Sequence, residues 1–475
     1  MKSLSKNYLY NLSYQILTLL TPLITTPYIS RTLGVDGIGE YSFSFSIVAY
    51  FVLLAQFGIA NFGQREIAYH QEDIKAQSRI FFETISFQVL TVSLSLVCYY
   101  ILGIEWRIDS QIYWVQALNI VAVLFDVSWF FQGLEEFGKI VTRNFIVRLA
   151  NIAFLFLFIK SPDNLILYTF IMGGMNVVSG VLICLFLKDY IHKVPISEIH
   201  PFRNWLPIFQ LFLPQIAIQI YVVLDKTMLG FMANDFTENG YYEQADKIIK
   251  MFLTIATSLG TVMLPRMASM VAKGEMETIK KFMMNSYRFS FFLTIPMSFG
   301  LITVAPNFVP WFFGPGYEPV SSVLAIISTM LIAVGISNVT GIQFMIPTNR
   351  QNQLTLSVIV GAIFNFVVNL YLIPHFYSTG VAIATVLTEW LVTFVQFYLV
   401  KDFFKVSDIL SQGKNYLLGG LVMLVITGTI SHYLTPSIFH SLFITLVGCG
   451  VYGSILVILK DEMVFLFLDK VKAKF

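Results

Sequence analysis

Long apolar runs separated by short polar segments follow one another along the whole chain. A transmembrane α-helix needs about 20 predominantly apolar residues. Runs of about that length lie at 9–29, 38–60, 80–103, 112–132, 140–159, 165–187, 207–231, 241–264, 282–305, 320–345, 354–373, 380–400, 414–434 and 439–459. These runs are far longer than the strands of a membrane β-barrel and lack their alternation of apolar and polar residues. The pattern predicts an all-α, polytopic membrane protein with about 14 transmembrane helices.

Composition narrows the class of protein further. Of the 475 residues, 56% are hydrophobic and 12% are charged, whereas soluble domains have about 25% charged residues. This argues against a soluble enzyme, a nucleic-acid binder and a disordered chain. The polar segments are too short for a catalytic or nucleotide-binding domain. The three Cys and six His have no metal-ligand spacing. We therefore expect no enzyme activity, no catalytic residue, no metal and no cofactor.

Lys and Arg are distributed unevenly between the two sets of loops. Of 30 such residues, 22 lie in segments on the side of the N-terminus, 3 in the opposite loops and 5 within the apolar runs. Cytoplasmic loops carry an excess of Lys and Arg. The first run continues to Ile29 without a small-residue cleavage site, which favours a membrane span over a signal peptide. The sequence predicts that both termini lie in the cytoplasm.

The two halves of the chain resemble each other. PYISRTLGVDGIGEYSFSFSI aligns with VVLDKTMLGFMANDFTENGYYEQADKI, which pairs Arg31 with Lys226 and Gly39 with Gly240. Six predicted spans separate the copies, so both have the same orientation. The repeat predicts two six-helix lobes around a central cavity. We expect an N-terminal lobe at 1–206, a C-terminal lobe at 207–405, and spans 13 and 14 with a short cytoplasmic tail at 406–475.

Several charged residues lie within predicted spans, where each costs roughly 2.5–3.5 kcal/mol at a helix centre. Such residues usually face a cavity and mark function. The cations are Arg148, Lys226, Lys247, Lys250 and Arg288, and the acids include Asp225, Asp246 and Glu389. Their excess of positive charge favours an anionic passenger, such as a lipid pyrophosphate that carries a sugar.

A structural interpretation of these charges stays open. Asp246 and Lys250 are four residues apart on one predicted helix, as are Glu243 and Lys247. Residues at that spacing can pair on one helix face. The pairs could therefore lock two helices together. Arg143 lies near the interface and could extend its side chain to it. Asp126 is more simply explained as a packing residue, and Glu389 as either a packing residue or a coupling site.

The pattern PYISRTLGVDGIGEYSFSFSI followed by GIANFGQREIA resembles the bacterial polysaccharide repeat-unit flippases, the Wzx-type proteins of the polysaccharide transporter family. LDKTMLG, GYYEQADKI and VMLPRM in the second half are similar to the same family. The similarity extends over about residues 5 to 400. This family belongs to the multidrug/oligosaccharidyl-lipid/polysaccharide exporter superfamily.

The resemblance implies a flippase of the bacterial cytoplasmic membrane. Its substrate would be an undecaprenyl-pyrophosphate-linked oligosaccharide repeat unit, moved by alternating access for capsule, O-antigen or exopolysaccharide synthesis. A polymerase and chain-length proteins would be its partners. By location, the candidate substrate-binding cations are Arg31, Arg148, Lys226, Lys250 and Arg288, and the polar or coupling candidates are Asp225, Asp246, Lys247 and Glu389. A drug–cation antiporter of the same fold is the alternative, and a membrane polysaccharide polymerase is a weaker one.

Overall fold

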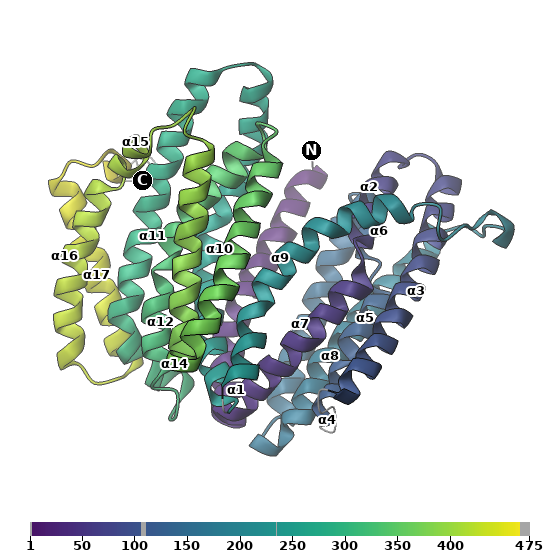
Figure 1. Ribbon diagram of the computed structural model, residues 1–475, viewed down its shortest axis with the longest axis horizontal. Coiled ribbons are helices and arrows are strands. Elements are labelled where there is room, and N and C mark those ends of the chain that lie inside the picture. The colour runs from purple at the N-terminus through teal and green to yellow at the C-terminus, as the bar shows by residue number, and fades with distance from the viewer. Residues whose placement is uncertain (1, 106–110, 234, 466–475) are drawn as a thin grey trace. The chain divides into compact units, whose positions relative to one another are not determined.

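The computed structural model describes residues 2–105, 111–233 and 235–465 of the chain (Figure 1). Every regular element in this part of the chain is a helix, so the predicted all-α class is confirmed. The elements up to residue 232 are α1 (Lys2–Gln56), α2 (Ile59–Tyr69), α3 (Ile74–Glu105), α4 (Gln111–Gln116), α5 (Leu118–Phe125), α6 (Ser128–Gly133), α7 (Phe137–Phe158), η1 (Pro162–Asn164), α8 (Leu165–Cys184), η2 (Leu185–Asp189), η3 (Ile196–Glu198) and α9 (Trp205–Met232). The later elements are α10 (Thr237–Ala272), α11 (Met276–Phe313), α12 (Val320–Ser328), α13 (Met330–Asn338), η4 (Val339–Met345), α14 (Gln351–Leu399), α15 (Val406–Ser411), α16 (Lys414–Tyr433) and α17 (Ile438–Ile458).

Two of the longest helices contain a single non-helical residue where the sequence predicts a connection between spans. In α1 this residue is Gly34, with φ 73° and ψ 174°. Glycine adopts positive φ without the steric cost that a Cβ brings. In α14 it is Tyr377, with φ 48° and ψ −127°. Each of these long elements therefore covers two predicted spans, and the break between them is one residue rather than a loop.

Two other predicted spans are divided into shorter helices. The fourth span, predicted at 112–132, consists of α4, α5 and α6. The tenth, predicted at 320–345, consists of α12, α13 and the π-helix η4. Short helices in series direct the chain through small bends, and π-helical turns occur frequently at functional sites. Ten helical stretches in the described part of the chain are long and apolar enough to cross a membrane. The number of 14 spans stays a prediction.

The chain forms two compact units, 1–227 and 228–475. In the first unit, α1 packs against α3 and α7, and α5 packs against α8. The helices α2 and α6 also pack together, and they do so at very short range. A Cβ atom at Gly63 of α2 would lie 2.3 Å from Cε3 of Trp129 in α6. Glycine is therefore needed there for the tryptophan ring to pack on the helix backbone.

In the second unit, α11 occupies the centre of the packing. It contacts α12, α13, α16 and α17. Buried side chains from α11, η4, α14, α16 and α17 share one apolar core, which includes Tyr287, Phe344, Phe397, Tyr416 and Leu456. The helix pair α16 and α17, predicted as an addition to the second lobe, is therefore continuous with the core of this unit. The lobe boundaries at 206 and 405 remain predictions.

Candidate functional site

Arg148 lies on the side of α7 that faces the interior of the first unit. Asn151 and Leu155 share that helix face, at spacings of three and seven residues. Asn151 Nδ2 lies 3.6 Å from the Sδ atom of Met172 in α8, and Leu155 is buried. The guanidinium Nη1 atom of Arg148 is itself buried. The residue thus occupies a protein-lined position within a membrane-span candidate.

The predicted pair Asp225 and Lys226 lies on the last part of α9 in the first unit. Asp225 is buried and Lys226 is half-buried. The next residue, Thr227, connects this turn of α9 to α1 through a hydrogen bond, in which its Oγ1 atom donates to Ser46 Oγ at 3.0 Å. Thr227 also accepts a hydrogen bond from Tyr50 OH at 3.2 Å. Both charged residues are therefore held at a fixed level along α1. Arg31 lies on α1 itself and is exposed.

The cations of α10, in the second unit, pair with acids on the same helix. Lys250 Nζ lies 2.7 Å from Asp246 Oδ2, and Lys247 Nζ lies 3.3 Å from Glu243 Oε1. Both local pairs agree with the four-residue spacing in the sequence. The acidic side chains are each 12% exposed, whereas those of Lys247 and Lys250 are 32% and 51% exposed. In each pair the acidic side chain is therefore more deeply buried than the lysine side chain.

Contacts between α10 and α14 place Glu389 at the level of Asp246. Ser378 N donates to Glu238 Oε2 at 3.0 Å, and Tyr242 OH lies 3.3 Å from Thr385 Oγ1. Residues four apart share a helix face, so one further turn along each helix reaches Asp246 on α10 and Glu389 on α14. Glu389 is half-buried there. Asp246 and Glu389, two of the three polar or coupling candidates in the second unit, therefore belong to one helix–helix contact.

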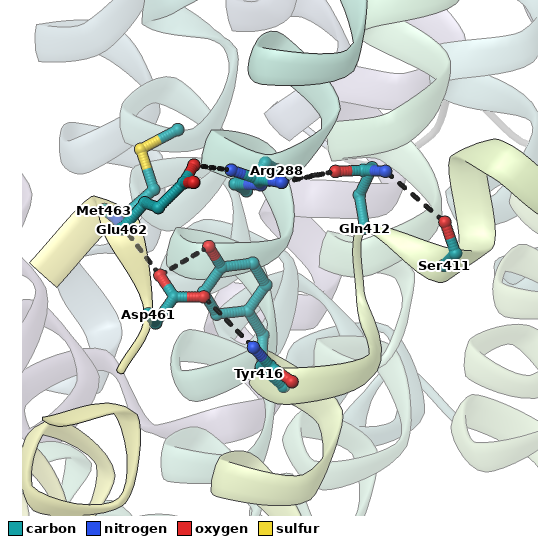
Figure 2. Close-up of polar contacts among 8 residues, drawn as sticks. Arg288, Ser411, Gln412, Tyr416, Asp461, Glu462 and Met463 are labelled. Carbon is teal, nitrogen blue, oxygen red and sulfur yellow. Dashed lines mark hydrogen bonds and ion pairs between the residues drawn. The ribbon is translucent and has the colours of Figure 1, made fainter. Parts of the chain in front are cut away.

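Arg288 differs from the other candidate cations because its partners lie near the last helix pair of the chain. Its Nε and Nη2 atoms donate to Gln412 Oε1 at 3.2 and 3.0 Å, and its Nη1 atom pairs with Glu462 (Figure 2). Gln412 lies between α15 and α16, and Glu462 follows α17. The guanidinium thus joins α11 to the last helix pair of the second unit. Protein groups therefore bind three of its nitrogens, and its role as a substrate-binding cation stays a prediction.

A second polar cluster beside Arg288 was not expected from the sequence. The carboxylate of Asp461 accepts a hydrogen bond from Tyr416 OH at 2.8 Å and one from Met463 N at 3.0 Å (Figure 2). Both Tyr416 and Asp461 are buried. Asp461 therefore connects the end of α17 to the start of α16. The last ten residues of the predicted cytoplasmic tail, 466–475, lie outside the described residues.

Arg143 is buried rather than extended to the membrane interface. Its Nη1 atom donates to Ser128 Oγ at 2.9 Å, and its Nε and Nη2 atoms donate to Asn144 Oδ1 at 2.9 and 2.6 Å. Asp126 accepts hydrogen bonds from the backbone and hydroxyl of Ser128, which supports its interpretation as a structural residue. These side chains tie α7 to α6.

Glu83 is a buried carboxylate that sequence reasoning missed. Its Oε1 atom lies 3.0 Å from Arg203 Nη1 and accepts from His200 N at 3.3 Å. Arg79, four residues earlier, is the partner that helix spacing would suggest. In the structure, the segment before α9 packs against α3, and this contact makes Arg203 the partner of Glu83. In the part of the chain that the structure describes, no group of His, Cys, Asp and Glu could hold a metal ion.

Comparisons with known proteins agree with this fold. A lipid II flippase, MurJ, in an inward closed conformation has a TM-score of 0.71 at 15% identity, covering 95% of this chain and 100% of that one. A multidrug resistance MATE family transporter of the MOP superfamily, in an inward-facing conformation, has a TM-score of 0.66 at 13% identity, covering 84% of this chain and 96% of that one. These likenesses show the fold of a multi-pass membrane protein.

Sequence comparisons identify the family. A protein of Escherichia coli K12, assigned by name to O-antigen transport, is 25% identical over 407 residues, which are 84% of this chain and 97% of that protein. A Haloferax volcanii protein, assigned by name as a flippase of low-salt glycan biosynthesis, is 21% identical over 399 residues and 81% of each chain. The family model described as polysaccharide biosynthesis protein matches residues 4–271, more than half of the sequence. The chain therefore belongs to the polysaccharide biosynthesis protein family, as its resemblance to the polysaccharide transporters led us to expect.

Proposed function

We propose that this protein is a flippase for undecaprenyl-pyrophosphate-linked oligosaccharide repeat units, used in capsule, O-antigen or exopolysaccharide synthesis. It moves its substrate across the membrane and catalyses no covalent chemistry. The observation that carries this proposal is the alignment, over 97% of its length, with a relative assigned to O-antigen transport. The glycan flippase relative supports the same substrate class.

Cations within the membrane give the proposed transport a physical basis. Arg148, Lys226 and Lys250 would meet the pyrophosphate, with Arg31 at the outer mouth of the pathway. Arginine binds phosphate through two parallel hydrogen bonds, and lysine attracts it as a compact charge. The buried guanidinium nitrogen of Arg148 and the half-exposed side chain of Lys250 support this assignment. The transport step would be tuned, or coupled to an ion gradient, by the remaining charged candidates, Asp225, Asp246, Lys247 and Glu389.

The proposed setting is the cytoplasmic membrane of a bacterium, with both termini inside. The excess of Lys and Arg on one side of the predicted spans supports this orientation. Two six-helix lobes would open alternately to the two sides, so that the sugar head crosses between them while the lipid tail stays in the bilayer. A polysaccharide polymerase and chain-length proteins would receive the exported repeat unit.

A drug–cation antiporter is the second candidate function, because the fold also matches a multidrug transporter at a TM-score of 0.66. Such a transporter is expected to rely on acids and apolar walls to bind a cationic drug. The cations at Arg148, Lys226 and Lys250 favour an anionic substrate instead. A polymerase is expected to carry a large outer loop. The longest outer segment predicted here, at 306–319, is short.

Deleting the gene in a strain that makes the polymer tests the proposal. Lipid-linked repeat units should accumulate on the inner leaflet, where a sugar-modifying enzyme reaches them only after spheroplasts are permeabilised. Re-expressing the chain should restore their exposure in intact spheroplasts. Normal outward exposure in the deletion strain would overturn the flippase proposal. Restored drug resistance in a susceptible host, without restored polymer export, would favour the antiporter.

A further inference from the structure

The segment that joins η2 to α9 carries apolar side chains that the protein does not cover. Ile196 is 88% exposed and Phe202 is 61% exposed. Trp205 and Leu206, at the start of α9, are about half exposed as well. Leaving apolar surface in water costs about 25 cal/mol for each Å². Side chains of this size are therefore expected to have an apolar or interfacial environment outside the protein.

Three contacts hold the ends of this segment against the first unit. Lys139 of α7 hydrogen-bonds to the hydroxyl of Tyr190, and its Nζ atom lies 3.8 Å from the centroid of that ring. The backbone N–H of His192 donates to Ser78 Oγ at 3.0 Å. Further along, Glu83 of α3 binds Arg203 and the backbone of His200, as described above.

These contacts restrict where the segment can lie. Ser78 and Glu83 belong to the first third of α3, and Lys139 belongs to the first turn of α7. The residues between these contacts, which include Ile196, therefore lie on the protein surface near the starts of α3 and α7. Because contacts hold both ends of this segment, the exposure of Ile196 is a property of the fold.

The flanking helices place the segment at the membrane boundary. The helical stretch Pro162–Asp189 is a membrane-span candidate that ends immediately before it, and the seventh predicted span begins immediately after it. Exposed Lys188 and Lys193 add positive charge. Apolar and aromatic side chains mixed with Lys are typical of elements that lie in the lipid headgroup region. Phospholipid headgroups attract such Lys residues where the leaflet is anionic.

We propose that residues 190–206 form an interfacial element that lies on the lipid headgroups, with Ile196 and Phe202 inserted between them. The occupant of this surface is the phospholipid leaflet itself and not a protein partner. This inference goes beyond the proposed transport function and does not depend on the substrate. It gives the start of α9 a fixed depth relative to the bilayer.

Site-specific fluorescence tests the proposal. Cys98, Cys184 and Cys449 are first replaced in the full-length chain, and single cysteines are introduced as Ile196→Cys and Phe202→Cys. Each is labelled with an environment-sensitive nitrobenzoxadiazole dye. The purified protein is placed in phosphatidylcholine and phosphatidylglycerol vesicles that contain no other protein. We expect blue-shifted emission, and quenching by lipids with a spin label near the headgroup.

Glu198→Cys provides a matched control in the same short helix, η3. Each step along a 3₁₀ helix turns the side-chain direction by about 120°, so Glu198, two residues after Ile196, does not share its direction. Dye at Glu198 should emit as in water and be quenched by a water-soluble quencher. Water-like emission at both Ile196 and Phe202, without lipid quenching, would overturn the proposal. So would blue-shifted emission that lipid-borne spin labels fail to quench, because the side chains would then be covered by protein. Ile196 is 88% exposed, so cysteine removes few packing contacts there, whereas Phe202→Cys also removes the edge contact of this ring with Phe87 of α3.

Discussion

Arg288 of α11 and Glu462, which follows α17, form an ion pair that joins segments far apart in the chain (Figure 2). Gln412 accepts two further hydrogen bonds from the same guanidinium. An arginine with these partners contributes to helix packing at the edge of the second unit. The Glu462 side chain is 77% exposed, and exposed ion pairs contribute about 0–1 kcal/mol. The contact therefore orients α16 and α17 more than it stabilises them.

We expect Arg288→Gln to retain transport, because the guanidinium binds Gln412 and Glu462 within the protein. Export of repeat units should stay close to that of the unmodified protein, since the variant loses only contacts within the protein, namely the ion pair with Glu462 and the hydrogen bonds to Gln412. Polymer export in a deletion strain, normalised to the amount of protein in the membrane, measures this. Loss of export at a normal protein level would support the predicted substrate-binding role of Arg288.

Arg148→Gln should have the opposite outcome to Arg288→Gln. A hydrogen bond to a charged group contributes about 1.5–3 kcal/mol, which corresponds to about a tenfold to hundredfold loss of export. Membrane abundance should change little. Arg143→Gln is the matched control on the same helix, because Arg143 binds Ser128 and Asn144. It should reduce the amount of folded protein and export together. Parallel losses of both quantities in Arg148→Gln would indicate a structural role.

The helices were predictable from the sequence because a bilayer requires long apolar runs. The break in α1 has a signal, since Gly34 tolerates positive φ. The break in α14 also lies where two predicted spans meet, three residues after Pro374, but the sequence does not indicate that Tyr377 adopts a φ of 48°. The next residue, Ser378, hydrogen-bonds through its backbone N–H and its hydroxyl to Glu238 of α10, and a single sequence does not show that contact.

The same distinction applies to the charged residues. The pairs Lys250–Asp246 and Lys247–Glu243 were predictable because residues four apart meet on a helix. The partners of Arg288 and Glu83 depend on which helices are neighbours, and that follows from the three-dimensional arrangement. Sequence reasoning therefore located charged residues within predicted spans but could not identify which of them bind protein groups on other helices.

Glu389→Gln tests the coupling assignment in the second unit. Glu389 and Asp246 lie at one level of the contact between α10 and α14. A neutral amide cannot gain or lose a proton, and it binds a cation less strongly than a carboxylate does. We therefore expect the variant to lose stimulation by an imposed proton or sodium gradient but to retain gradient-independent transport. Fluorescent lipid-linked oligosaccharide in proteoliposomes measures both rates.

Glu275→Gln is the control for the loss of one negative charge in the second unit. Glu275 precedes α11 and is exposed, so gradient stimulation should persist in this variant. Stimulation that is unchanged in Glu389→Gln would exclude Glu389 as a coupling group.

The ion pair between Glu83 and Arg203 predicts an asymmetric effect on stability. The Glu83 side chain is 4% exposed and that of Arg203 is 41% exposed. Removing Arg203 leaves a buried carboxylate without its charged partner, which is costly, whereas neutralising Glu83 leaves an arginine that water can solvate. Arg203→Ala should therefore lower the free energy of unfolding by about 1–3 kcal/mol, and Glu83→Gln by less. Adding Glu83→Gln to Arg203→Ala should recover part of the loss. Thermal unfolding of the purified variants in detergent measures all three, with Glu72→Gln as the control for an exposed acid near α3. A double variant that is less stable than Arg203→Ala would show that Glu83 contributes through contacts other than this ion pair.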